Sequence, residues 1–307
     1  MSLGTAHAKI ILMGEHSVVY GYPAIAIPFV MGNIETKITD KQSELWMDSI
    51  LYHGPLKKAP SFLDNLTFLI EELLKTMNYS RRDLLFTITS NIPPQRGLGS
   101  SAAVAVSVVR AVFKYFDQPL SDQQLLDWVE VAEKIAHGNP SGLDGRITTS
   151  KKPLYYIKNQ PFVPFDISGE AYLVIADSGL QGQTKQAVQH LGQLIQENQG
   201  LYQPTLAQLG HAAQGSFEAL NQQDFKQLGL LMNEAHRLLK ICQVSHPKLD
   251  ELVDTARQAG ALGAKMTGGG LGGCIIALAK DYPQALEIEK ALSTLAETTW
   301  ITALNND

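Results

Sequence analysis

Three charged residues in this sequence have side chains suited to phosphoryl transfer, and two of them, Lys9 and Glu133, lie where their type is unusual. Lys9 lies within the apolar run AKIILMG, although strand interiors avoid lysine unless it is at an edge or has a partner. Glu133 falls at the edge of the apolar face of a predicted helix, where a half-buried carboxylate is costly unless it is paired or binds a cation. Asp144 follows in HGNPSGLDG, whose Pro and Gly residues predict a structured loop rather than a helix.

A glycine-rich loop, GLGSS at residues 97–101, precedes a long apolar segment in which we predict a helix from Ser100. Glycine lets a backbone approach an anion closely, and the N–H groups at a helix N-terminus attract one, so the loop suits a phosphate cradle. The alternative is a tight loop that needs positive φ, with its serines as N-caps. In the helix that follows, Ser107, Arg110 and Lys114 share one narrow stripe, which we predict to face solvent while the rest of the helix is buried. A rigidly fixed N-terminus favours the anion site.

The charged residues also have structural alternatives. Glu133 could form an ion pair with a nearby Lys or Arg, and an Asp in a turn, such as Asp144, usually caps the backbone. Together, however, the loop and the three charged residues supply what phosphoryl transfer requires. These requirements are a phosphate cradle, a ligand for Mg²⁺, an acceptor for the hydroxyl proton and a cation for the developing charge.

Two other nucleotide-binding motifs fit this sequence poorly. The pattern GxxxxGK[ST] is absent. Residues 97–102 match GxGxxA and residues 268–273 match GxGxxG, but the first lies far from its preceding strand and the second leads into an apolar strand, CIIALA. A dinucleotide fingerprint needs strand, glycines and helix in close succession. We therefore disfavour an NAD-dependent oxidoreductase.

The elements that must position these residues predict an α+β protein with two domains, residues 1–178 and 179–307. Alternating and apolar runs predict strands in the first domain, and apolar residues at helical spacing predict helices in both. The predicted strands cover residues 8–14, 24–40, 85–90, 171–179, 274–279 and 298–304. The predicted helices cover residues 61–77, 100–116, 121–138, 184–196, 204–221, 224–242 and 247–260, and one more before the last strand.

Composition excludes several classes of partner. The 307 residues are 45% hydrophobic and 18% charged, with a net charge of −5 and no cluster of Lys and Arg. Nucleic acids and anionic membranes both require a basic face, so we expect neither as a partner. No apolar run is long enough to span a bilayer, and no signal peptide is recognisable. The two cysteines, Cys242 and Cys274, lie in unlike contexts and fit a reducing cytoplasm, without a disulfide framework or zinc site.

Three motifs carry a resemblance to a known family. The first is KIILMGEHSVVYGYPAIAIP (residues 9–28), the second is PPQRGLGSSAA (93–103) and the third is KMTGGGLGGC (265–274). Between the second and the third, EKIAHGNPSGLD (133–144) shows the same resemblance. In these motifs the chain resembles the GHMP kinase superfamily, and within it the mevalonate kinases. The resemblance extends along most of the chain. It implies an N-terminal domain like domain 2 of ribosomal protein S5, a ferredoxin-like C-terminal domain and an active site in the cleft between them.

The resemblance also implies roles for individual residues. ATP, Mg²⁺ and mevalonate would be the ligands, with Asp144 accepting the proton of the primary hydroxyl and Lys9 stabilising the alkoxide or the transferring phosphoryl group. Ser101 and Glu133 would bind Mg²⁺. The nucleotide-binding residues would be Pro94, Arg96, Gly97, Leu98, Gly99, Ser100 and Ser101. The substrate-binding residues would be Lys9, Glu15, His16, Asp144, Gly268 and Gly269.

Some alternatives stay open at this point. Phosphomevalonate kinase is the nearest rival, although its first motif more often has Glu-Tyr in place of Glu15-His16. A second rival is an inactive family member that binds nucleotide and acts as a regulator. Arg96 replaces a small residue frequent in the family, and either contacts phosphate or faces solvent. Arg146 could hold a substrate carboxylate or form a structural ion pair. The sequence leaves oligomeric state open, a homodimer included, and likewise feedback regulation and the adenine pocket.

Overall fold

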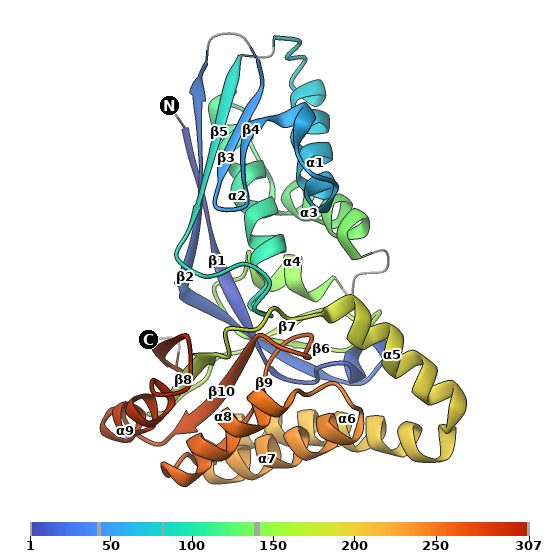
Figure 1. The fold of residues 1–307 in the computed structure, drawn as a ribbon, viewed down its shortest axis with the longest axis vertical. Helices are drawn as coiled ribbons and strands as arrows, with labels where there is room; N and C mark the ends of the chain where they lie inside the picture. The colour runs from blue at the N-terminus through green and yellow to red at the C-terminus, as the bar shows by residue number, and fades with distance from the viewer. Residues whose placement is uncertain (1, 42–43, 82, 138–141, 306–307) are drawn as a thin grey trace. The chain divides into compact units, whose positions relative to one another are not determined.

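A computed structural model of the chain describes residues 2–41, 44–81, 83–137 and 142–305 (Figure 1). It packs as two compact units that alternate along the sequence. The first unit comprises Met1–Lys9, Phe29–Pro94 and Gly99–Thr149, and the second comprises Ile10–Pro28, Gln95–Leu98 and Ser150–Asp307. The predicted α+β class is confirmed. The predicted boundary between residues 178 and 179 falls inside the second unit, and as a division of the sequence into domains it stays a prediction.

A sheet that belongs largely to the first unit is formed by β2 (Ala24–Asp40), β5 (Leu84–Ser90), β3 (Trp46–Ser49) and β4 (Tyr52–Pro55), with β1 (Ser2–Met13) paired to β2. The end of β1 from Ile10 and the start of β2 up to Pro28 are part of the second unit. β5 runs antiparallel to β2, with Ile34 opposite Ser90 and Asp40 opposite Leu84. β3 is parallel to β5 and antiparallel to β4. Two short 3₁₀ turns, Leu56–Lys58 and Ser61–Leu63, lead into the helices. These are α1 (Asp64–Thr76), α2 (Ser100–Tyr115), α3 (Asp122–His137) and α4 (Leu143–Ile147).

Helix α2 begins at Ser100, as predicted, and is almost entirely buried. It packs directly on β1, because a Cβ on Gly4 would lie 2.1 Å from the carbonyl oxygen of Ser107. The prediction that Ser107 lies on a solvent-exposed stripe is wrong. Its hydroxyl is fully buried, lies 2.7 Å from that of Thr36 on β2 and donates to the carbonyl of Val104. The buried polar group is therefore satisfied within the first unit.

A capping box fixes the start of α3. The Ser121 hydroxyl accepts from the Gln124 amide at 3.2 Å, and the Gln124 side chain accepts from the Ser121 amide at 3.0 Å. This reciprocal arrangement satisfies two N–H groups that the helix leaves free. It fixes the start of the helix that carries Glu133, which was predicted over residues 121–138 and extends over Asp122–His137.

The second unit contains the 3₁₀ turn η1 (Ser17–Tyr20), the pairing of Ala24–Ala26 with β6 (Leu154–Tyr156), and β7 (Val163–Pro164) beside β6. Its main sheet has the order β11-β8-β10-β9, and all its pairs are antiparallel. The strands are β8 (Tyr172–Asp177), β9 (Gly263–Met266), β10 (Cys274–Ala279) and β11 (Thr298–Ala303). In chain order this is fourth, first, third, second, as expected for the ferredoxin-like βαββαβ arrangement.

Five helices complete the second unit. They are α5 (Thr184–Glu197), α6 (Gln199–Asn221), α7 (Phe225–Ile241), α8 (Pro247–Gln258) and α9 (Tyr282–Leu292). In Figure 1, α6 and α7 pack together, while α7 and α8 contact β9. Helix α6 starts five residues before the predicted Pro204, because the side chain of Asn198 caps it by accepting from the amide of Leu201. Within the described residues, no helix has the length and apolarity needed to cross a bilayer.

Candidate active site

Lys9 and Asp144 form an ion pair in the first unit. The Lys9 Nζ lies 3.1 Å from the Asp144 Oδ1. Lys9 itself is buried in β1, whereas 37% of the Asp144 side chain is exposed. The structure thus places a fixed cation next to a carboxylate that a ligand can reach. Both residues were candidates from sequence: Lys9 lies inside an apolar strand, and Asp144 supplies a carboxylate on a structured segment.

The prediction that Asp144 lies on a loop is wrong. It lies in the first turn of the five-residue helix α4, whose N-cap is Gly142. Gly142 has a φ of +76°, a left-handed conformation that glycine adopts at little cost and that lets the chain turn into the helix. Gly142, one of the glycines that suggested a loop, is therefore the residue at which a helix begins. A carboxylate in a first helical turn is electrostatically favourable.

Gly99 lies against the side chain of Lys9. A Cβ on Gly99 would lie 2.5 Å from the Lys9 Cγ, so only glycine fits without displacing the lysine. Gly99 is also the N-cap of α2, with a φ of +71° and no side-chain hydrogen bond to the helix. Ser100 and Ser101 come after the cap, so the alternative that serines cap this helix is wrong. Because Gly99 has no side chain, it does not cap the first N–H groups of α2. A site that binds an anion through these N–H groups requires this.

Glu133 is 5% exposed, which is more deeply buried than the half-buried position predicted for it, and it accepts a hydrogen bond from Ser101. Burial, and to a smaller extent the negative charge of Asp144, raise the pKa of Glu133 to about 7. The hydrogen bond from Ser101 and the charge of Lys9 act in the opposite direction. The Asn65 side-chain amide lies 3.5 Å from the Ser101 hydroxyl. Two carboxylates, a hydroxyl and one lysine thus influence one another in the first unit.

This donor set fits Mg²⁺, which prefers hard oxygen ligands and usually keeps places for water and substrate phosphates. The pKa of Glu133 is raised by burial and by the nearby charge of Asp144, and a bound cation would act against both effects. Within the described part of the chain, no three His, Cys, Asp or Glu side chains gather as a complete metal site. A cation bound here would therefore depend on Glu133, Ser101 and oxygens from a ligand.

In the second unit, His16 contacts the third glycine-rich motif. Its Nε2 lies 3.0 Å from the carbonyl oxygen of Gly269, so Nε2 carries the proton and donates. Burial lowers the pKa of His16 to about 4, so the ring is neutral near pH 7 and its Nδ1 is an acceptor. The backbone of His16 has a φ of +60°, which is uncommon for a residue other than glycine. Such strain is typical of functional positions.

Glu15 forms a buried ion pair with Lys265. The Lys265 Nζ contacts the Glu15 Oε1 and donates to the carbonyl oxygen of Met266 at 2.7 Å. The Lys265 side chain is fully buried and that of Glu15 is 1% exposed. Burial lowers the pKa of Lys265, and the charge of Glu15 opposes that effect. Sequence reasoning missed Lys265, although a lysine inside the apolar run ALGAKM is the same signal that identified Lys9.

Two glycine segments pack backbone against backbone in the second unit. A Cβ on Gly97 would lie 2.9 Å from the carbonyl oxygen of Thr267, and a Cβ on Gly268 would lie 2.7 Å from the Cα and carbonyl oxygen of Gly97. Both glycines have positive φ, +78° and +81°. The Thr267 hydroxyl donates to the carbonyl of Ile11 at 2.8 Å. The glycines of the second and third motifs are thus required by close approach as well as by backbone conformation.

Arg96 forms a buried ion pair with Asp177. Its Nε lies 2.7 Å from the Asp177 Oδ2, with 13% of the arginine side chain and none of the aspartate side chain exposed. The alternative that Arg96 faces solvent is therefore wrong. Sequence reasoning also missed Asp177, because it ends the strand AYLVIAD without any motif of its own.

The other predicted site residues are placed as follows. Leu98 is buried, so its backbone alone could meet a ligand, and Pro94 is half-buried. Arg146 lies in the last turn of α4. Residues 138–141 of the motif EKIAHGNPSGLD lie outside the described residues. Gly269 accepts the hydrogen bond from His16 and packs against the Thr184 side chain.

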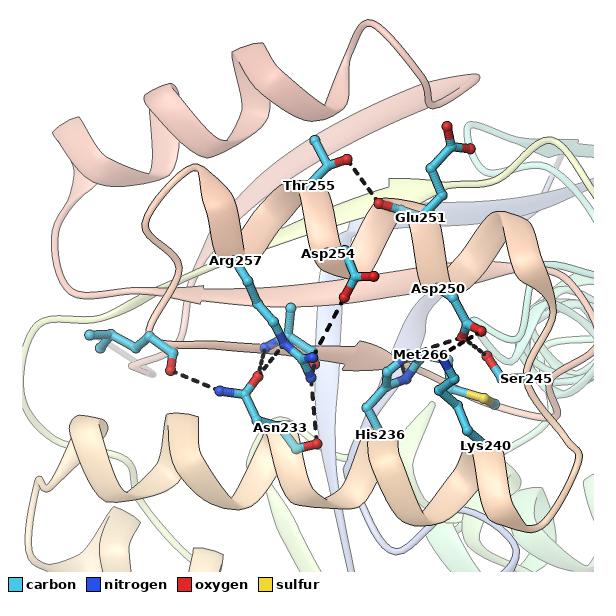
Figure 2. Close-up of polar contacts among 12 residues, drawn as sticks. Asn233, His236, Lys240, Ser245, Asp250, Glu251, Asp254, Thr255, Arg257 and Met266 are labelled. Atoms are coloured by element: carbon cyan, nitrogen blue, oxygen red, sulfur yellow. Dashed lines mark hydrogen bonds and ion pairs between the residues drawn. The ribbon is translucent and has the colours of Figure 1, made fainter.

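Figure 2 shows a polar network that holds the strand carrying Lys265. The Asn233 side chain on α7 accepts from the amide of Ala264 at 3.0 Å and from the Nε of Arg257 at 2.6 Å. The His236 Nδ1 accepts from the amide of Met266 at 3.3 Å. Because Nδ1 is the acceptor, the His236 Nε2 carries the proton and lies 3.2 Å from an oxygen of Asp250. Strand β9 is thus fixed on its α7–α8 side by buried and partly buried polar contacts.

A hollow of about 420 Å³ opens beside this network. Its lining residues are His236, Arg237, Lys240, Ile241, Asp254 and Arg257. The three basic side chains already have carboxylate partners: Arg237 with Glu234, Lys240 with Asp250 and Arg257 with Asp254. No residue predicted for the site lines this hollow, and its charges are balanced without a ligand.

Two family patterns match the chain. Residues 65–149 match "GHMP kinases N terminal domain" and residues 216–297 match "GHMP kinases C terminal". The chain is 35% identical to a mevalonate kinase of Pyrococcus abyssi, with 99% of this chain and 96% of that protein covered.

Two solved structures are similar over nearly the whole chain. The L. major mevalonate kinase in complex with R-mevalonate has a TM-score of 0.85 and 26% identity, with 99% of this chain and 96% of that one covered. The mevalonate kinase of methicillin-resistant Staphylococcus aureus has a TM-score of 0.77 and 34% identity, with 99% of each chain covered. The similarities thus span both matched patterns and the segments around them.

Proposed function

Because the chain belongs to the GHMP kinases, and among them to the mevalonate kinase family, we propose that it transfers the terminal phosphoryl group of ATP to the 5-hydroxyl of mevalonate. The observation that carries this proposal is the Lys9–Asp144 pair. It combines a reachable carboxylate and a fixed ammonium group 3.1 Å apart, as transfer to an alcohol requires.

Asp144 would accept the proton of the attacking hydroxyl as the new P–O bond forms. Lys9 would orient the carboxylate and offset the negative charge that develops on the hydroxyl and phosphoryl oxygens. The burial of Lys9 within β1, together with its contact to Gly99, restricts where its ammonium group can lie. Both residues belong to the first unit, so their mutual geometry is fixed by one fold.

The loop at residues 97–101 would bind the phosphates of ATP through backbone N–H groups, including those at the start of α2. Ser101 and Glu133 would hold Mg²⁺, which neutralises phosphate charge when bound. The Glu133 carboxylate must be ionised to do so. Its raised pKa therefore implies that metal binding is favoured as the pH rises through about 7.

Glu15 and His16 would bind the substrate, together with the backbone of Gly268 and Gly269. Neutral His16 has its Nδ1 available to accept from a substrate hydroxyl, because its Nε2 donates to Gly269. The ion pair with Lys265 holds the carboxylate of Glu15 in place. These assignments rest on position and hydrogen-bonding capacity.

A coupled assay of ADP release tests the proposal. Mevalonate should give turnover that requires Mg²⁺, and phosphomevalonate should give little. Turnover with phosphomevalonate alone would instead identify a phosphomevalonate kinase. Nucleotide binding without turnover on either substrate would identify an inactive, regulatory family member.

A further inference from the structure

We propose that Arg96 and Asp177 act as positioning residues, anchoring the start of the phosphate loop to the end of β8 without contacting ATP. This inference rests on the proposed function for the identity of the nucleotide. The contact that carries it is the ion pair between the Arg96 Nε and the Asp177 Oδ2, which are 2.7 Å apart, with the Asp177 side chain fully buried.

The loop needs an anchor because its backbone is strained at Gln95. This residue has a φ of +59° without being a glycine, and such a conformation persists only when the surrounding structure determines it. Gly97, with a φ of +78°, adopts its conformation at little cost. Glycine at 97 contributes no side chain to hold the loop. Arg96, between these two residues, provides the long side chain that does.

The other end of the anchor is rigid. Asp177 is the last residue of β8, the strand between β11 and β10, where it lies opposite Thr298 on one side and Cys274 on the other. Its Oδ1 accepts from the amide of Gly179 at 2.9 Å, which leaves Oδ2 for Arg96. The carboxylate is thus oriented by the backbone before the arginine binds it.

Backbone contacts continue the same attachment. The amide of Gly182 donates to the carbonyl of Gln95 at 2.8 Å, and a Cβ on Gly273 would lie 2.7 Å from the carbonyl oxygen of Arg96. The guanidinium is thus directed toward β8 while the loop backbone stays in contact with the turn after β8 and with the third motif. An arginine engaged in this way pre-organises the loop, and pre-organisation increases affinity by reducing the ordering that binding requires.

The test uses a double variant, Arg96→Met with Asp177→Asn, because a single change leaves a buried charge without its partner and threatens folding. Two properties are measured, and neither needs turnover. The first is the affinity for a non-hydrolysable ATP analogue, by calorimetry. The second is hydrogen exchange of the amides in residues 93–101 in the protein without nucleotide. The matched control, Arg237→Met with Glu234→Gln, removes an exposed ion pair of α7.

Positioning predicts that the double variant binds the analogue about 10-fold more weakly and that its loop amides exchange several-fold faster than in the wild type. The control should change neither. Unchanged affinity would overturn the proposal and leave the pair a purely structural role. Weaker affinity with unchanged exchange would also overturn it. That result would mean that the pair acts only on bound nucleotide and does not order the loop in the protein without nucleotide. If the wild type turned over no mevalonate, the proposed function would fail while both measurements remained decisive.

Discussion

At the scale of single residues, the first unit contains two carboxylates in very different electrostatic environments. Asp144 lies near Lys9 and is partly exposed, whereas Glu133 is buried and is made harder to ionise by the same Asp144. Two carboxylates placed so differently are suited to different tasks. The accessible one can exchange a proton with a ligand, and the buried one gains most from a bound cation.

Asp144→Asn tests the first task. The amide keeps the shape of the side chain but cannot accept the hydroxyl proton, so kcat should fall by about 10²- to 10⁴-fold. Affinity for an ATP analogue should stay within about 3-fold, because a change that keeps the shape of a partly exposed side chain usually has a small energetic effect. Asp127→Asn, an exposed carboxylate on α3 that accepts from Gln123, is the control and should keep full turnover. Comparable rates in both variants would exclude Asp144 as the base.

Glu133→Gln tests the second task through pH. A folded-state pKa of about 7, against an ordinary value of 4.5, means that the native state binds the proton more tightly than the unfolded state. The burial of the charged form therefore lowers stability as the pH rises from about 4.5 to 7, by on the order of 3 kcal/mol. Without metal, the variant should melt about 5 °C above the wild type at pH 8 and close to it near pH 4.5.

The melting experiment also reports on the cation. Mg²⁺ should raise the melting temperature of the wild type at pH 8 and leave that of Glu133→Gln unchanged. Glu130→Gln, on the same helix and exposed beside Lys134, is the control and should respond to Mg²⁺ as the wild type does. An identical Mg²⁺ response in all three proteins would place the cation elsewhere.

At the scale of elements, glycines determine how closely backbones approach. Gly4 lets α2 pack on β1, and Gly99 lets the start of α2 pass over Lys9. Gly97 and Gly268 let the second and third motifs touch. Glycine is required at these positions because backbone atoms, or the side-chain carbons of Lys9, occupy the space that a Cβ would need.

Gly268→Ala should impair the site more than an equivalent glycine elsewhere. Its φ of +81° and a backbone contact of 2.7 Å to Gly97 mean that the added methyl group brings both conformational strain and a clash. We expect kcat/KM to fall by at least about 10-fold, since small misplacements of a site can be that costly. Gly260→Ala is the matched control: its φ is +95°, but the nearest atom would be 3.6 Å away. Equal kinetics in the two variants would show that the contact is unimportant.

At the scale of the whole molecule, residues far apart in sequence form single ion pairs. Glu15 and Lys265 are separated by 250 positions, and Arg96 and Asp177 by 81. Each pair joins two of the family motifs, or a motif and a strand, within the second unit. The alternation of the two units along the chain follows from such pairs, because residues 10–28 and 95–98 belong with the C-terminal part of the chain.

Lys265→Met should destabilise the protein by about 3–5 kcal/mol, because it strands the buried charge of Glu15. Adding Glu15→Gln should recover much of that loss, since no charge is then left unpaired. Denaturant unfolding of the wild type, the two single variants and the double variant gives the coupling energy. Strictly additive effects would show that the two residues do not stabilise each other.

The sequence by itself determined the family, the α+β class, most of the helices and strands, and the residues whose types suit phosphoryl transfer. Hydrophobic period, caps and motifs are local, so they can be read without a structure. What only the tertiary structure decided is which partner each charged residue meets: Lys9 with Asp144, Glu15 with Lys265 and Arg96 with Asp177. It also placed Asp144 on a helix and buried Ser107. Such outcomes depend on packing between segments that are distant in the sequence, so local spacing does not predict them.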